Sequence, residues 1–185
     1  MKTLILTCSL LICGLSFGQY YYITEVGDTP GSINQDPAYP NGSGQESGWT
    51  SLLGPSVEPA EWSAIQSIPF PFNFNGNLVT EYKVSSTGVL TFSTSATAVP
   101  GPSSSALPNA NIPDNSICLW GLIASGTNDN VSTKTFGAAG SQQEWIHFSS
   151  CVNGTIGWSY WSIVLEEGSD HIYIVDQRNT SGDGA

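Results

Sequence analysis

Apolar and polar residues alternate along several short segments of the chain, and the clearest case lies at residues 68–92. Phe70, Phe72 and Phe74 share one face of an extended segment, and two prolines and an asparagine share the other. Because proline cannot donate a hydrogen bond to a neighbouring strand, this segment is predicted to lie at the edge of a sheet.

Turn residues divide this stretch into hairpins. Asn75 and Gly76 favour a type I′ turn, because both residue types tolerate the positive φ angles that this turn requires. Tyr82 and Val84 then alternate with charged residues, and Gly88 separates them from the apolar run VLTF. The pattern predicts two consecutive β-hairpins.

Further strand-like segments are bounded by Gly, Pro, Asn or Ser. They lie at residues 20–26, 49–53, 62–68, 117–123, 131–136, 144–148, 158–166 and 171–176. Residues 117–123 (ICLWGLI) are apolar on both faces, which favours a central strand covered on both sides. Gly168, Ser169 and Asp170 are predicted to join the last two strands as a hairpin.

No window of helical length has a 3.6-residue period. The chain is therefore predicted to be all-β, with two antiparallel sheets packed as a β-sandwich of the jelly-roll or Ig-like kind. Long loops rich in Pro, Ser and Gly, at residues 27–48 and 93–116, interrupt the strands. We expect essentially no helix in the mature chain.

Three regions follow along the chain. Residues 1–18 have the basic start, apolar middle and small-residue end of a secretory signal peptide, with cleavage before Gln19. Residues 19–48 are predicted to form an N-terminal strand and a flexible loop, and residues 49–185 the β-sandwich domain. Because the chain ends soon after a strong hairpin strand, we expect the sandwich to be truncated and the chain to be a fragment of a longer protein.

The net charge of the chain limits the classes of partner that it can bind. Cleavage of the signal peptide removes Lys2. The remaining cations are Lys83, Lys134 and Arg178, against fifteen Asp and Glu residues. Binding to phosphate backbones or anionic lipids depends on Lys and Arg, so neither nucleic acid nor membrane insertion of the mature chain is expected. A glycan or a surface protein is the expected partner, and the expected location is secreted or at the outer cell surface.

Cysteine usage fits export. Cys8 and Cys13 leave with the signal peptide, and Cys118 and Cys151 remain. In an oxidising compartment these two are predicted to form a disulfide, which would stabilise the fold by about 3 to 4 kcal/mol. The alternative is two free thiols that pack as small hydrophobic groups.

Candidates for catalysis are sparse. Residues 157–161 (GWSYW) approach a nucleophile elbow around Ser159, but the second glycine is missing. His147 and His171 lie in strand-like segments, where a structural histidine is the commoner case. Glu166 and Glu167 are adjacent, so a strand would point them to opposite faces rather than to one glycosidic bond. We predict no catalytic residues.

Metal and cofactor sites are equally sparse. Residues 128–130 (NDN) and 181–184 (SGDG) gather oxygen ligands of the kind that calcium prefers, but neither matches an EF-hand loop. Asn and Asp also favour such turns without an ion. No cofactor or metal ligand is predicted, and calcium stays a weak alternative.

Aromatic residues suggest a binding surface. Trp158, Tyr160 and Trp161 fall on one strand, and Trp145 and Tyr173 fall on neighbouring strands. Rings exposed together on one sheet face would stack against sugar rings. The same rings could instead fill the core of the sandwich, which a domain of this size also needs.

The order of these motifs resembles a known group of proteins. The segments FPFNFNGNLVTEYKVSSTGVLTF, ICLWGLI, TFGAAGSQQEWIHFSS and SYWSIVLEEGSDHIYIVDQRN, together with the signal ending SFGQ, resemble N-terminal β-sandwich regions of secreted or surface proteins of Bacteroidetes. Those proteins are similar to type IX secretion substrates with a C-terminal sorting domain. The aromatic hairpin is also similar to the opening of nidogen-like extracellular modules.

This resemblance covers about residues 68–179 and implies export, a β-sandwich and an accessory or adhesive role. It transfers no catalytic residue. The sequence therefore predicts a non-catalytic extracellular β-sandwich module of a larger secreted or cell-surface protein, in adhesion or ligand presentation. The alternative is a carbohydrate-binding accessory domain of a secreted hydrolase.

Overall fold

The computed structural model describes residues 48–102, 109–119, 121–153 and 156–180. These ranges contain ten strands and no helix. The strands are β1 (Thr50–Leu53), β2 (Gln66–Phe74), β3 (Asn77–Val84), β4 (Val89–Thr91), β5 (Ser116–Cys118), β6 (Leu122–Ile123), β7 (Asn130–Phe136), β8 (Gln143–Asn153), β9 (Ile156–Glu166) and β10 (Ile172–Thr180). Within these ranges, no helix has the length and apolar character needed to cross a membrane.

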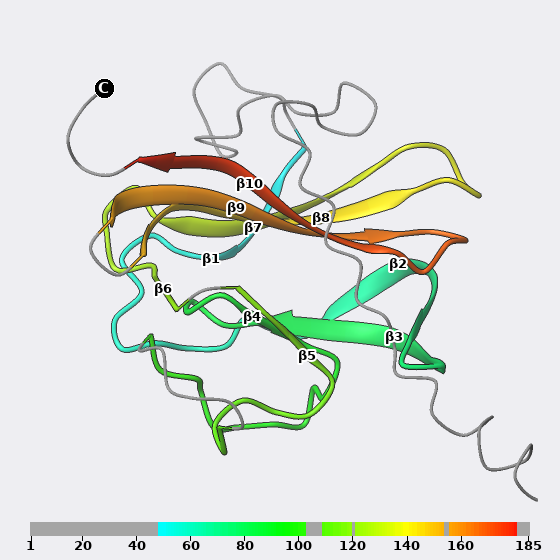
Figure 1. The fold of residues 1–185 in the computed structure, drawn as a ribbon, viewed down its shortest axis with the longest axis horizontal. Helices are drawn as coiled ribbons and strands as arrows, with labels where there is room; N and C mark the ends of the chain where they lie inside the picture. The colour runs from blue at the N-terminus through cyan, green and yellow to red at the C-terminus, as the bar shows by residue number, and fades with distance from the viewer. Residues whose placement is uncertain (1–47, 103–108, 120, 154–155, 181–185) are drawn as a thin grey trace, which may run out of the picture.

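The strands form two sheets that lie one over the other (Figure 1). The six-stranded sheet has the order β1-β7-β8-β9-β10, with β6 paired to β8, and the four-stranded sheet has the order β2-β3-β4-β5. All the pairs are antiparallel. The predicted two-sheet β-sandwich is therefore confirmed.

The first predicted hairpin forms as the alternation indicates. β2 is the edge strand of its sheet, and Phe70 and Phe72 are buried on its inner face while Pro69 and Pro71 are exposed. Phe74 pairs with Asn77 across a two-residue loop. Asn75 has φ 51° and Gly76 has φ 76°, so both residues adopt the left-handed region of a type I′ turn.

The second hairpin turns at Gly88, where φ is 86°. Its hydroxyl groups hold the turn to the loops beside it. Ser85 Oγ accepts hydrogen bonds from backbone amides two and four positions later, and the Thr87 hydroxyl donates to the Pro100 carbonyl at 2.8 Å. Ser86 Oγ accepts from the Glu61 amide at 3.1 Å. Residues 85–88 (SSTG) thus connect their own turn to the loops that contain Glu61 and Pro100.

The core lies between the two inner faces. Its largest fully buried members include Phe72, Tyr82, Leu90, Leu122, Ile146, Phe148, Ile163 and Leu165. These residues alternate along their strands with side chains on the outer faces, as a sandwich requires. Burying each large apolar side chain contributes about 1.5 to 3 kcal/mol, so this layer is the main source of stability.

The prediction of one central strand at residues 117–123 is wrong. β5 belongs to the four-stranded sheet and β6 to the six-stranded sheet, so the chain crosses from one layer to the other. Gly121 has φ 23° at the crossing, and Leu119 and Leu122 are both buried against Gly88. The segment is apolar on both sides because it passes through the core rather than along a doubly covered sheet.

The predicted disulfide is also wrong, because the thiols of Cys118 and Cys151 are free. Ile117 packs against the core cluster, so Cys118, the next residue of β5, points away from it and is exposed. Cys151 is fully buried within the core cluster, on β8 of the other sheet. The four-stranded sheet therefore lies between the two sulfurs.

Other predictions are adjusted or lie outside the described residues. Within residues 62–68 the strand begins only at Gln66, and Trp62 makes an isolated bridge to Ser85. The predicted loop at 93–116 connects β4 to β5, which already begins at Ser116, and the Trp62 indole donates to the Ala98 carbonyl in this loop at 2.9 Å. The predicted signal peptide and the strand at 20–26 lie outside the described residues.

Candidate functional site

The outer face of the six-stranded sheet, which points away from the core, carries most of the predicted ring residues. Trp145 precedes the core residue Ile146 on β8, so it points to this outer face. Tyr160 on β9 and Tyr173 on β10 lie on the same side by the register of the strands. Trp161 instead packs against the core cluster. Trp158 pairs with Thr180, and its side chain is outside the described part of the chain.

Burial separates these rings from an exposed stacking platform. Trp145 is only 2% exposed and Tyr160 only 6%. The Trp145 indole donates a hydrogen bond to Gln143 Oε1 at 3.1 Å. Tyr173 is half-buried, at the end of the face formed by the β9–β10 hairpin. The structure therefore brings Trp145, Tyr160 and Tyr173 to one face, and leaves the Tyr173 ring the most accessible of the three.

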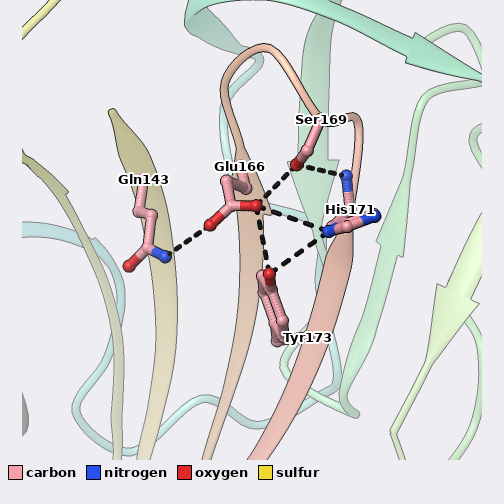
Figure 2. Close-up of polar contacts among 5 residues, drawn as sticks. All are labelled: Gln143, Glu166, Ser169, His171 and Tyr173. Carbon is pink, nitrogen blue, oxygen red and sulfur yellow. Dashed lines mark hydrogen bonds and ion pairs between the residues drawn. The ribbon is translucent and has the colours of Figure 1, made fainter. Parts of the chain in front are cut away.

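A polar cluster lies at the hydroxyl end of that ring (Figure 2). We name it the Glu166 cluster: Gln143, Glu166, Ser169, His171 and Tyr173. Glu166 Oε2 accepts hydrogen bonds from the Ser169 hydroxyl at 2.5 Å and the Tyr173 hydroxyl at 3.0 Å. Glu166 Oε1 accepts from the Gln143 amide at 3.0 Å, and His171 Nδ1 lies 3.5 Å from Oε2. The side chain of His171 is 66% exposed.

These contacts keep the carboxyl group ionised. Partial burial alone would raise the pKa of Glu166, but hydrogen bonds from Ser169, Gln143 and Tyr173 lower it, and so does the charge of His171 when protonated. The net effect is a pKa below the ordinary value. Glu166 is thus a stable acceptor at neutral pH rather than a proton donor.

The cluster contains a histidine, a hydroxyl and a carboxylate, but they are not arranged as a catalytic triad. A triad uses one imidazole nitrogen for the nucleophile and the other for the carboxylate. Here His171 Nδ1 is near both the Tyr173 hydroxyl, at 3.3 Å, and Glu166. The Ser169 hydroxyl donates directly to Glu166, and the His171 backbone amide donates to Ser169 Oγ at 3.1 Å. These bonds hold the hairpin turn in place.

The second histidine lies in the middle of the outer face. His147 is fully buried, shares a 3.0 Å hydrogen bond with Ser162 Oγ through Nδ1, and stacks on Tyr160 with the ring centroids 6.3 Å apart. Ser159, the centre of the elbow-like sequence, is also fully buried, and its hydroxyl donates to the Cys151 carbonyl at 2.8 Å. Neither residue has the exposed geometry of a nucleophile elbow.

The hairpin carboxylates next to Glu166 have separate structural tasks. Glu167 Oε2 accepts from the amides of Gly140 and Gln142 at 2.7 and 3.0 Å, which fixes the β7–β8 turn. Asp170 accepts from the backbone amide and the side chain of Asn73 at 2.8 and 3.0 Å. Asp170 thereby ties the β9–β10 hairpin to β2 in the other sheet. Glu166 and Glu167 contact different partners, and Glu167 lies in the turn beyond the end of β9.

A buried polar network joins the two sheets elsewhere. The Tyr82 hydroxyl on β3 donates to Glu144 Oε1 at 3.1 Å and contacts Thr133 Oγ1 at 3.1 Å. The hydroxyls of Thr133 and Thr135 also donate to Glu144, at 2.5 and 2.6 Å. Burial raises the pKa of Tyr82 well above its ordinary value, and the adjacent Glu144 raises it further. Tyr82 therefore stays protonated and acts as a donor.

The acidic turn considered for calcium is closed by its own hydrogen bonds. Asp129 Oδ2 accepts from the backbone amide of Gly126 at 2.8 Å. The side-chain amide of Asn130 donates to the backbone carbonyl of Asn128 at 3.2 Å. Burial raises the pKa of Asp129. In the described ranges, no group of three or more His, Cys, Asp or Glu side chains is placed to hold a metal ion. Residues 181–184 lie outside those ranges.

The sequence indicates Tyr173, Glu166 and His171 separately, and nothing in it predicts that they meet. Glu166 and His171 lie opposite each other across the predicted hairpin, so the pairing register of the hairpin is enough to bring them together. Gln143 comes from β8, whose register with β9 depends on the tertiary fold. No local pattern pointed to it.

Residues 47–185 match the family described as NIDO related, whose domains are typically extracellular. This match agrees with the nidogen-like part of the predicted resemblance. It names neither Bacteroidetes nor type IX secretion, and those assignments stay predictions. No curated protein and no solved structure matches the chain. Because the matched region covers most of its length, the chain belongs to the NIDO-related family.

Proposed function

We propose that this domain is a non-catalytic extracellular module of a larger secreted or cell-surface protein, acting in adhesion or ligand presentation. Membership of the NIDO-related family supports an extracellular setting. The observation that carries the proposal is that the candidate reactive groups are used to hold the fold. Ser159, Glu166 and Glu167 each bond to a turn or a neighbouring strand.

A rigid two-layer frame suits such a role. Tyr82 and Glu144 connect the sheets in the interior, and Asp170 and Asn73 connect them at the hairpin end. Loops held this way present their surfaces without large rearrangement, which lowers the entropic cost of binding. The acidity of the chain, with a formal net charge of −11, supports a basic or neutral partner rather than nucleic acid or an anionic membrane.

The test is a screen of the chain without its predicted signal peptide against extracellular matrix proteins, glycan arrays and a panel of hydrolase substrates. The proposal expects saturable binding without turnover. Turnover that is abolished by His171→Ala, with the fold intact by circular dichroism, would contradict it. His147→Ala serves as the second variant, although loss of this buried ring also affects packing.

The second candidate is the carbohydrate-binding accessory domain. The half-buried Tyr173 ring favours it, because a sugar could stack on this ring while Glu166 and His171 offer polar groups at its hydroxyl end. Loss of glycan-array binding in Tyr173→Ala, but not in Tyr173→Phe, would support this candidate. Trp161→Ala is less informative, because Trp161 packs against the core.

A further inference from the structure

Among the described residues, the last strand leaves a long sheet edge unpaired. β10 covers Ile172–Thr180 and pairs only with β9 among the described strands. Its ladder is regular from Ile172 to Asp176, and a bulge then follows before Arg178. Sheet edges expose unpaired amide and carbonyl groups that another strand can use.

The register shows which backbone groups point outward. The Glu166 amide donates to the His171 carbonyl at 3.0 Å, so these two residues form a hydrogen-bonded pair. Hydrogen-bonded and non-hydrogen-bonded pairs alternate along an antiparallel ladder. Tyr173 and Val175 therefore bond to β9, and Ile172, Ile174 and Asp176 direct their backbone groups away from it. We name these outward groups the β10 edge.

The other sheet edges are blocked or short. β2 carries Pro69 and Pro71, which interrupt its hydrogen-bonding capacity, and β1 and β5 have only four and three residues. β10 has nine residues and contains neither proline nor lysine. Soluble proteins usually protect such edges, so the contrast within one domain marks the β10 edge as a pairing surface.

Side chains and charge indicate what would pair there. Ile172 and Ile174 are only partly buried where they pack against the core cluster, so a partner strand with apolar residues at alternate positions would cover them. A second copy of this chain would bring another net charge of −11, which opposes self-association. An extended segment with Lys or Arg at the intervening positions is complementary instead.

We propose that the β10 edge binds an extended, proline-free and basic segment of another polypeptide as an additional antiparallel strand. The antiparallel direction follows the rest of the six-stranded sheet. This inference deepens the proposed function and rests on it only for the extracellular setting of the partner.

The first test uses a blocked synthetic peptide, one residue shorter than β10, that alternates valine and lysine, so two residues of each kind lie nearest its centre. In an antiparallel pair, residues opposite Ile172 and Ile174 bond to the β10 edge and point their side chains to the same face. Valine is then the bonded residue. N-methylation of the two central valines should abolish binding, and N-methylation of the two central lysines should preserve it. Equal effects of both changes, or the reverse result, would overturn the proposal.

The second test changes the protein. Ile174→Pro removes an outward amide without removing a β9–β10 hydrogen bond, and should weaken peptide binding about tenfold. Ile174→Val keeps the amide and should bind like the unchanged chain. If Ile174→Pro does not fold, the N-methylated peptides decide the question with the protein unaltered.

Two further outcomes have fixed meanings. Dimerisation of the chain in sedimentation experiments, abolished by Ile174→Pro, would identify a second copy as the occupant and overturn the assignment of a basic partner. If the unchanged chain does not bind the valine–lysine peptide but does bind a matrix protein or a glycan in the screen above, this inference alone is overturned. Turnover in that screen would overturn the proposed function while leaving the edge test valid.

Discussion

At the scale of single residues, buried polar groups form specific connections that periodicity does not reveal. Tyr82 was expected on the apolar face of its strand, and it is fully buried there. Its hydroxyl reaches Glu144, which lies in the other sheet and 62 positions away. An alternating pattern predicts which face a side chain takes, but it holds no information about a partner on a distant strand.

Tyr82→Phe is expected to destabilise the domain by about 2 kcal/mol, because it removes a buried donor to a carboxylate. Glu144 keeps the bonds from Thr133 and Thr135, so the domain should still fold. Urea unfolding followed by tryptophan fluorescence measures the change. The matched control is Tyr173→Phe, whose half-exposed hydroxyl should contribute less. Equal losses of unfolding free energy in the two variants would contradict the larger stabilisation expected from the interior network.

Glu166 makes stability depend on acidity. Its pKa in the folded chain is lower than the ordinary value of 4.5, so the unfolded chain binds the proton more readily in acid. The stabilisation is complete above the ordinary value and is lost as pH falls through the folded-state pKa. Glu166→Gln should flatten this part of the urea-midpoint profile between about pH 6 and about pH 3. Identical profiles for the two proteins would exclude this role for Glu166.

At the scale of elements, local turn chemistry determined what could be predicted. The hairpins at Asn75 and Gly76, at Gly88 and at residues 168–170 form where the turn residues indicated. Residues 117–123 did not follow, because apolar residues on both faces fit a covered strand and a crossing through the core equally well. The positions of Trp145 and Tyr160 on the outer face follow from alternation, but their burial depends on the tertiary fold.

The two turn glycines offer a matched pair of substitutions. Gly76 has φ +76° and no atom within 4 Å of an added Cβ, so Gly76→Ala should cost only backbone strain, about 1 kcal/mol. At Gly88, with φ +86°, an added Cβ would lie 3.0 Å from Leu122 Cγ and 3.3 Å from Leu119 Cβ. Gly88→Ala should therefore cost at least about 1 kcal/mol more. Equal losses of unfolding free energy in the two variants would show that Leu119 and Leu122 move to accommodate the added Cβ at little cost.

At the scale of the whole molecule, packing and hydrogen bonds connect the two layers without a covalent bridge. The export signal favoured a disulfide, but that inference concerns the compartment and not the geometry. Cys118 and Cys151 lie on opposite sides of the four-stranded sheet, a relation that depends on the crossing at Gly121. A prediction of one strand at residues 117–123 omits this crossing, so it cannot place the two cysteines correctly.

Thiol labelling tests this arrangement directly. Cys118 is exposed, so a maleimide should reach it in the native chain. The surrounding residues partly desolvate its thiol and raise the pKa, so the reaction should be slow. Cys151 is fully buried, and burial together with the charge of Asp129 raises its pKa much further, so it should react only after unfolding. Mass spectrometry of the chain without residues 1–18 should find one label before urea and two after it, and reductant should leave the urea midpoint unchanged. A chain that accepts no label until it is reduced would instead contain the bridge, and the two sheets would have to pack differently around residues 117–123.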